Sequence, residues 1–205
     1  ALAIILPLFL PIAVSVIGGD TVAGEASNGT LRYLLTRPVG RSRLLTAKLV
    51  TIVTFIFLAV IVVALVALAA GVVLFGIRPL SSISATELTP WETFVRTVLA
   101  IGYIGWSMLG LGGIALFAST RTDSPLAASL ATLAAFVGSQ VLDLISATQV
   151  IQPYLPTHYW LKFVDFYRDP ILGRDVARGA GLQLVYMAVF LGGAWANFTT
   201  KDVTS

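Results

Sequence analysis

Few residues in this sequence could perform chemistry. It has one histidine, His158, and no cysteine, so neither a metal site built from these ligands nor a thiol nucleophile is expected. None of its three lysines follows a glycine, which excludes a P-loop of the G-x-x-x-x-G-K-[ST] type. The nearest serine motif, Gly105-Trp106-Ser107, lies in an apolar run that does not contain the histidine a serine nucleophile needs. We therefore expect no catalytic residues, no enzyme activity and no cofactor bound by this chain.

The most informative polar stretch, residues 20–48, separates two long apolar runs. Gly18-Gly19 is expected to break the first run, and Asp20 to cap a new short helix whose positive end Glu25 would favour. Asn28-Gly29 then indicates a turn or kink. The elements around the stretch therefore predict a helix that begins at the membrane surface.

Leucines inside this stretch follow helical spacing. Leu31, Leu34 and Leu35 lie at i, i+3 and i+4, which predicts a small amphipathic helix ended by Pro38 and Gly40. Its apolar face could dip into lipid while neighbouring arginines meet anionic headgroups, or it could contact a protein partner. Periodicity alone favours lipid.

The composition predicts an all-α, polytopic membrane bundle. Hydrophobic residues make up 57% and charged residues 11% of the 205 residues, and the mean hydropathy is +0.91. Crossing a ~30 Å bilayer core takes about 20 apolar residues in a helix, and continuous runs predict helices rather than barrel strands. The net charge of +3 belongs to the loops and indicates topology, not nucleic-acid binding. The expected spans are residues 1–17, 49–77, 97–118, 126–146 and 181–198.

Two spans carry further signals. In residues 97–118 and just beyond, Gly105, Gly112, Ala115 and Ser119 share one helical face, which predicts close helix packing within the chain or with a second copy. Asp143 lies about 27 Å from the start of its span and should reach the far interface.

The loop before residue 97 contains one expected ion pair. Glu92 and Arg96 are expected to pair at i, i+4.

Residues 147–180 are expected to form a re-entrant or interfacial region. Trp160, Phe163, Val164 and Tyr167 recur at i, i+3, i+4 and i+7, which predicts an amphipathic helix with its aromatic side in the membrane interface. The basic residues do not decide orientation by number, with seven on the side of residues 20–48 and six opposite. Five of the seven fall within residues 20–48, which places that stretch in the cytoplasm.

The same stretch resembles the signature of type-2 ATP-binding-cassette (ABC) transporter permeases. That family has a D-x-x-x-G-E segment, then G-T-L-x-x-L-L-x-R-P-x-x-R and an A/G-K pair. The matching residues are Asp20, Gly24, Glu25, Gly29, Thr30, Leu31, Leu34, Leu35, Arg37, Pro38, Arg41 and Ala47-Lys48. Residues 154–160 resemble the outer re-entrant region of the family, and Phe198 with Lys201-Asp202-Val203 resembles its C-terminal ending.

The resemblance implies the permease subunit of an ATP-driven exporter in the cell membrane, with six spans, of which the first would precede this sequence. Residues 1–205 would form one transmembrane domain, with residues 20–43 as the cytoplasmic coupling region and the C-terminus on the same side. Two cytoplasmic ABC ATPase subunits would hold ATP and Mg²⁺, and an identical or related permease would complete the dimer. The motif residues would contact the ATPase, and Gly18, Gly19 and Gly40 would act as hinges. The outer interface would comprise Tyr154, Pro156, Tyr159, Trp160, Phe163 and Tyr167.

The low charge of the spans suggests an apolar or amphiphilic cargo. One alternative keeps the same complex but makes it a mechanical device, which transmits ATPase motion to an extracytoplasmic partner without moving cargo. The sequence leaves both functions open.

Overall fold

The computed structural model describes residues 2–29, 40–76, 83–84 and 86–200, and the side chains from Leu8 onward except that of Phe75. This part of the chain is helical and contains no strand, as predicted. Five segments are long and apolar enough to cross a membrane: residues 8–27, 41–74, 90–121, 125–144 and 173–200. The helices are α1 (Leu2–Ser27), α3 (Arg41–Phe75), α4 (Pro90–Ser107), α5 (Leu109–Arg121), α6 (Pro125–Leu144) and α7 (Gly173–Thr200), and three short 3-10 helices are η1 (Ser146–Thr148), η2 (Gln152–Tyr154) and η3 (Trp160–Tyr167).

Helix α1 is continuous, so the predicted break at Gly18-Gly19 is wrong and Asp20 lies inside the helix instead of capping a new one. The two glycines allow close approach of neighbouring helices. A Cβ atom on Gly18 would lie 2.5 Å from the Cβ of Ala115 in α5, and one on Gly19 would lie 2.7 Å from the backbone nitrogen of Ser129 in α6. These contacts stabilise a helical conformation that two glycines would weaken in an isolated segment.

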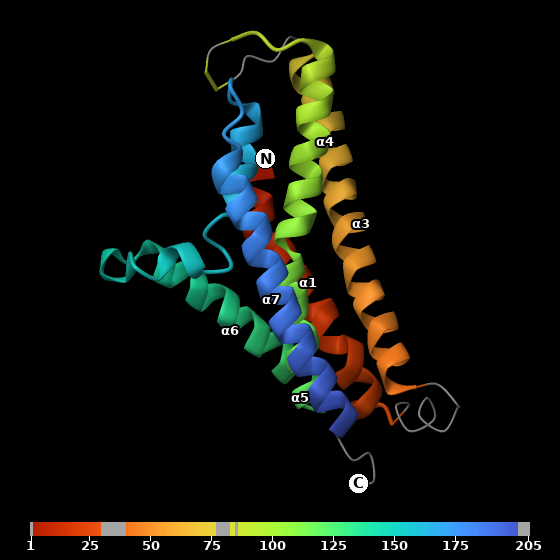
Figure 1. Cartoon of the computed structure of the whole chain (residues 1–205). Helices are drawn as coiled ribbons and strands as arrows, with labels where there is room; N and C mark the ends of the chain where they lie inside the picture. Colours follow the sequence, from red (N-terminus) through yellow and green to blue (C-terminus); the bar gives the residue numbers. More distant parts are fainter. Residues whose placement is uncertain (1, 30–39, 77–82, 85, 201–205) are drawn as a thin grey trace.

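Helix α5 occupies the centre of the bundle and contacts α1, α3, α6 and α7 (Figure 1). Its glycines face different neighbours: Gly112 lies against Ile52 and Ile56 of α3, and Gly113 against Met187 of α7. The predicted small-residue packing is therefore confirmed, and it joins helices of this chain. The expected single span of residues 97–118 consists of two helices, α4 and α5. The series of α-helical backbone hydrogen bonds is interrupted at Met108, whose N–H donates to the carbonyl oxygen of Gly105, three residues earlier.

Several helices extend beyond their apolar runs. Helix α3 begins at Arg41 instead of residue 49 and has 35 residues, about 52 Å. Its first turns thus carry Arg41, Arg43 and Lys48, three of the five basic residues that we assigned to the preceding loop. Helix α4 begins at Pro90, where Thr89 and Glu92 form a reciprocal capping box. The predicted Glu92–Arg96 pair is wrong, because the carboxylate of Glu92 accepts the Thr89 N–H at 2.9 Å.

Arg96 instead turns inward and is only 8% exposed. Its guanidinium donates to the carbonyl oxygens of Arg168 at 2.8 Å and Phe166 at 3.4 Å. Asp169 lies 3.8 Å from the same group. Arg96 therefore fastens the end of η3 to α4.

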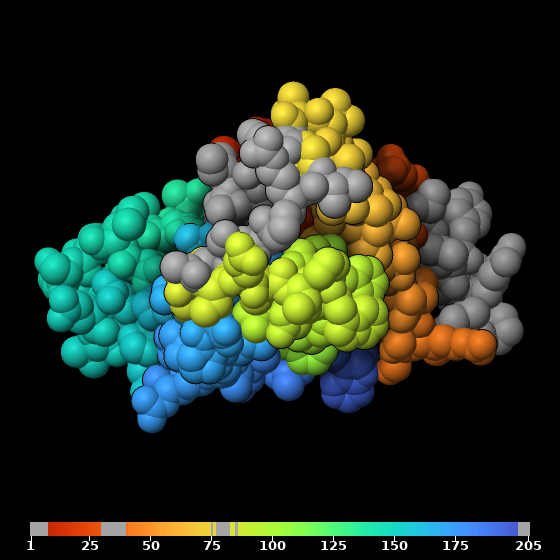
Figure 2. Space-filling view, turned by 90° about the horizontal axis from the view of Figure 1, so that it is seen from above, coloured from red at the N-terminus to blue at the C-terminus, as the bar shows by residue number. Residues whose placement is uncertain are grey.

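The aromatic segment after α6 differs most from its prediction. Residues 160–167 form a 3-10 helix, and Trp160 and Phe163 are buried in protein instead of facing the membrane interface. The Trp160 ring stacks on Phe136 of α6 with centroids 5.6 Å apart. Figures 1 and 2 show η1 and η2 projecting to one side of the bundle before the chain returns to α7. Packing against α4, α6 and α7 supplies the apolar environment that we had assigned to lipid.

The glycine contacts predict opposite effects for two Gly→Ala substitutions. Gly19→Ala should destabilise the fold by about 1–3 kcal/mol, because its Cβ meets the backbone of Ser129. Gly102→Ala in α4 should be neutral or stabilising by up to about 1 kcal/mol, since a Cβ there meets no atom within 4 Å. Thermal unfolding in detergent, followed by circular dichroism, measures both. Equal shifts in Tm would contradict the close approach of α1 and α6.

Candidate functional site

Helix α1 ends and helix α3 begins at the same end of the bundle. We call residues 28–40, which join them, the connector, and this end the connector end. It is formed by the end of α1, the start of α3, the end of α5, the start of α6 and the end of α7 (Figure 1). Gly29 has a φ of +69°, so the turn predicted at Asn28-Gly29 is confirmed. Gly40 precedes the first residue of α3. The predicted site residues Thr30, Leu31, Leu34, Leu35, Arg37 and Pro38 lie outside the described residues, so the position of the leucine face stays a prediction.

Ser119 locks the end of α5 to α1. Its hydroxyl is fully buried, accepts the backbone N–H groups of Val22 at 3.0 Å and Ala23 at 2.9 Å, and donates to Gly19 O at 2.7 Å. The small-residue face had placed Ser119 at a helix contact but gave no sign of these three hydrogen bonds. One buried hydroxyl with three backbone partners fixes both the distance and the register of the two helices.

An ion pair joins the two helices that flank the connector. The Nζ of Lys48 in α3 contacts a carboxylate oxygen of Glu25 in α1, and the two side chains are 19% and 25% exposed. Gly24 lies beside them, and a Cβ at this position would meet the carboxylate of Asp20. The structure therefore brings together four residues of the signature at the end of α1: Asp20, Gly24, Glu25 and Lys48.

A second fastening joins α3 to the end of α7. The Nη1 of Arg41 donates to Thr199 O at 2.8 Å and to Phe198 O at 3.4 Å. A positive charge is favourable at this position, because the last carbonyl groups of a helix have no partner within the helix and form the negative end of its dipole. The indole N–H of Trp195 donates to Ser42 Oγ at 2.9 Å. Sequence reasoning found Arg41 but missed Ser42 and Trp195, since nothing in their spacing indicates that α3 and α7 meet.

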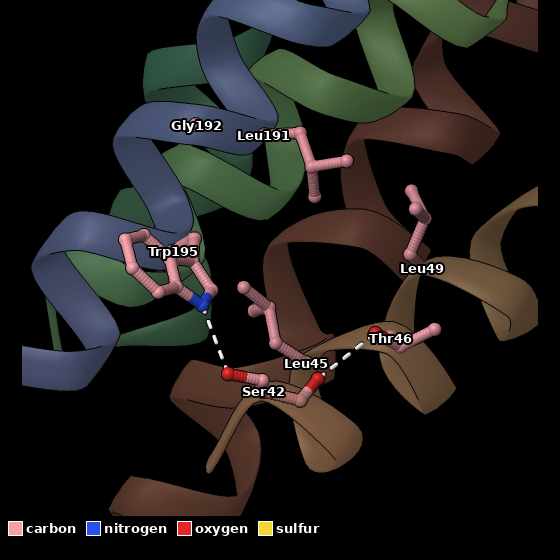
Figure 3. Close-up of a pocket in the computed structure, with 7 residues that line it drawn as sticks. All are labelled: Ser42, Leu45, Thr46, Leu49, Leu191, Gly192 and Trp195. Atoms are coloured by element: carbon pink, nitrogen blue, oxygen red, sulfur yellow. Dashed lines mark hydrogen bonds between the residues drawn. The ribbon is translucent and has the colours of Figure 1, made fainter.

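Beside this fastening, α3 and α7 leave a groove with a volume of about 390 Å³. Its walls combine leucines with a polar rim and with Gly192, which presents no side chain (Figure 3). The indole of Trp195 reaches across the groove toward Ser42. The lining residues are Ser42, Leu45, Thr46, Leu49, Leu191, Gly192 and Trp195.

The predicted outer interface lies near the opposite half of the bundle and is held by side chains of α4 and α7. The carbonyl oxygens of Tyr154, Pro156 and Tyr159 accept hydrogen bonds from Tyr186 Oη, Gln183 Nε2 and Tyr103 Oη, at 2.9, 2.6 and 2.9 Å respectively. Non-helical backbone in an apolar environment needs such partners within the protein. Tyr167 Oη similarly donates to Thr97 Oγ1 at 3.0 Å. Of the predicted interface residues, Tyr159, Trp160 and Phe163 are thus buried against neighbouring helices, whereas the ring of Tyr154 is exposed.

Asp143, near the end of α6, contacts the same returning segment. Its Oδ1 lies 2.6 Å from Nδ1 of His158, and one turn earlier Ser139 Oγ lies 2.7 Å from Thr157 Oγ1. The sequence predicted that Asp143 reaches the end of its span, and the structure gives it a partner there. The pair ties the end of α6 to the returning chain.

The Glu25–Lys48 contact predicts measurable coupling between α1 and α3. Glu25→Gln and Lys48→Met should each lower stability, and the double variant should cost less than the sum of the two by about 0.5–1 kcal/mol, since both groups are partly exposed. A double-mutant cycle from chemical unfolding in detergent measures this difference. Strict additivity would show that the pair does not link the helices energetically.

Comparison with known proteins identifies the family but not an activity. A family model described as "Protein of unknown function (DUF2705)" matches residues 2–161. The chain is also 28% identical over 201 residues to the "Uncharacterized membrane protein YdbK" of Bacillus subtilis (strain 168), across 92% of this chain and 75% of that protein. Together with the five apolar helices, these matches make the chain a multi-pass helical membrane protein. It belongs to the DUF2705 family.

Proposed function

We propose that this chain is the transmembrane permease subunit of an ATP-driven ABC exporter. The observation that carries the proposal is that the sequence stretch resembling a coupling motif joins two helices that are firmly fastened to the rest of the bundle. Helix α1 is held to α5 by Ser119 and to α3 by Glu25–Lys48, and α3 is held to α7 by Arg41. A partner that pulls on the connector would therefore move several spans together.

Force transmission of this kind requires stiff elements on both sides of the gripped segment. Both flanking elements are long helices, of 26 and 35 residues, and their contacts reach the central α5. A ligand or partner shifts a conformational equilibrium only through contacts that differ between the two states. ATP-dependent closure of two ATPase subunits would supply that difference at the connector.

The contacts within the chain refine the roles of the signature residues. Glu25 and Arg41 contact α3 and α7 respectively, so the proposal gives them the task of holding the connector's ends. Binding to the ATPase then falls mainly to Leu31, Leu34 and Leu35, which would fill an apolar groove on the partner. We no longer assign a hinge role to Gly18 and Gly19, because both lie within a continuous helix and against neighbouring helices.

The remaining parts of the proposal follow from the same family resemblance. The connector end would face the cytoplasm, two ATPase subunits would bind MgATP below it, and a second permease copy would complete the pathway. The cargo would be apolar or amphiphilic, in keeping with spans that carry few charges.

Mechanical transmission without cargo is a second candidate, favoured by the tight packing of the returning segment. Arg96 on α4 and Gln183 on α7 are both buried and bind carbonyl groups of residues 156–168. Motion of α4 or α7 would therefore reach this segment directly. Substrate flux in sealed vesicles that contain the complex separates the two functions, since only the exporter moves cargo.

The proposal predicts that single acidic substitutions in the connector strongly weaken ATPase binding. Leu34→Asp or Leu35→Asp should reduce co-purification of the ATPase subunit by more than about tenfold, since burying one leucine contributes roughly 1.5–3 kcal/mol. Co-purification from native membranes, read by mass spectrometry and ATPase assay, measures the loss.

Ile83→Asp provides the matched control, because Ile83 is 52% exposed and lies in the loop between α3 and α4. This loop follows the end of α3 that is far from the connector. It should leave ATPase binding unchanged. Wild-type protein that recovers no ATPase, or Leu34→Asp and Leu35→Asp variants that bind it normally, would refute the coupling role.

A further inference from the structure

The groove between α3 and α7 combines an apolar floor with a polar rim. Leu45, Leu49 and Leu191 supply the apolar part, whereas Ser42, Thr46 and the indole nitrogen of Trp195 lie toward the connector end (Figure 3). Trp195 is 51% exposed, and amphipathic indole rings favour the level of lipid headgroups. The uncharged run of α3 begins at Leu49, so the rim lies where the apolar part of the helix gives way to its basic start.

The start of α3 supplies the basic residues near the rim. Lys48 pairs with Glu25 of α1 and Arg41 binds carbonyl groups at the end of α7, whereas Arg43 is exposed. The facing part of α7, residues 191–200, has no charged residue. The positive end of the α3 helix dipole lies here, and Arg41 binds the carbonyl groups at the negative end of α7. A ligand that fills the groove and reaches its rim would therefore be favoured by a negative charge at one end and an apolar body at the other.

We propose that this groove binds one phospholipid with an anionic headgroup from the leaflet at the connector end. An acyl chain would lie along the leucines, and the phosphate would lie near Arg43 and Ser42. Ser42 Oγ accepts the Trp195 N–H, so its own hydroxyl proton can be donated to a phosphate oxygen. The bound lipid would bridge α3 and α7 beside the Arg41 contact and stabilise the same fastening. This site does not depend on whether the protein transports a cargo.

Two glycines of α7 offer a matched pair of variants. A Cβ on Gly192 in the groove or on Gly181 outside it meets no atom within 4 Å, so both positions have room for a side chain. Gly181 precedes Gly192 by eleven residues, about three helical turns, and so lies on nearly the same face. Gly192→Leu should fill the groove, whereas Gly181→Leu adds the same side chain elsewhere on that face.

Native mass spectrometry of the protein equilibrated with phosphatidylglycerol or phosphatidylcholine of equal chain length tests the proposal. Wild type and Gly181→Leu should retain one phosphatidylglycerol, and Gly192→Leu should retain no more of it than of phosphatidylcholine. Arg43→Gln should reduce retention about fivefold, as expected for one basic residue at a lipid surface. Equal retention of both lipids by wild type, or normal retention by Gly192→Leu, would overturn the site.

A measurement on the unaltered groove guards against misfolding of Gly192→Leu. Phosphatidylglycerol with brominated acyl chains should quench the fluorescence of wild type more than that of Trp195→Phe, because Trp195 lines the groove. Brominated phosphatidylcholine should show a smaller difference. Equal quenching of the two proteins would refute lipid binding. The site would also be refuted if the wild type were a dimer and Gly192→Leu dissociated it while leaving lipid retention unchanged, because the groove would then bind a second copy of the chain.

Discussion

The close packing of α5 against its neighbours is the constraint on which the rest of the bundle depends. Gly18 of α1 meets Ala115, and Gly112 meets Ile52 and Ile56 of α3, at distances that larger side chains would not allow. In lipid, helices gain little from burying apolar surface, so close van der Waals contact and a few hydrogen bonds decide how they associate. Because α5 touches α1, α3, α6 and α7, its small residues set the positions of the other helices, and Ser119 fixes one of them by hydrogen bonds.

The second constraint is that backbone groups outside helices need partners. Between α6 and α7 the chain has only 3-10 turns, and Tyr103, Gln183 and Tyr186 bind its carbonyl oxygens from neighbouring helices. Arg96 does the same near the end of η3. This segment is therefore shaped by side chains that come from elsewhere in the sequence, which explains why its own periodicity predicted its structure poorly.

The two ends of the bundle use different fastenings. At the connector end, charged and hydroxyl side chains join α1, α3, α5 and α7, and they leave the α3–α7 groove between them. In the opposite half, the contacts hold the returning segment to α4 and α7. A bundle tied at both ends through α7 responds as a unit to a displacement at either end, which suits either transport or mechanical transmission.

The sequence by itself determined the helical class, the five apolar spans, the turn at Asn28-Gly29 and the packing role of the small-residue face, because span length and residue size act locally along a helix. Only the tertiary structure decided that α1 continues through Gly18-Gly19, that Trp160 and Phe163 are buried, that Arg96 binds η3 instead of Glu92, and that Ser42 meets Trp195. Each of these depends on a partner outside the local helix, from Phe136 for Trp160, 24 residues away, to Trp195 for Ser42, 153 residues away. Hydrophobic periodicity shows which face of a helix is apolar but not whether lipid or protein covers it.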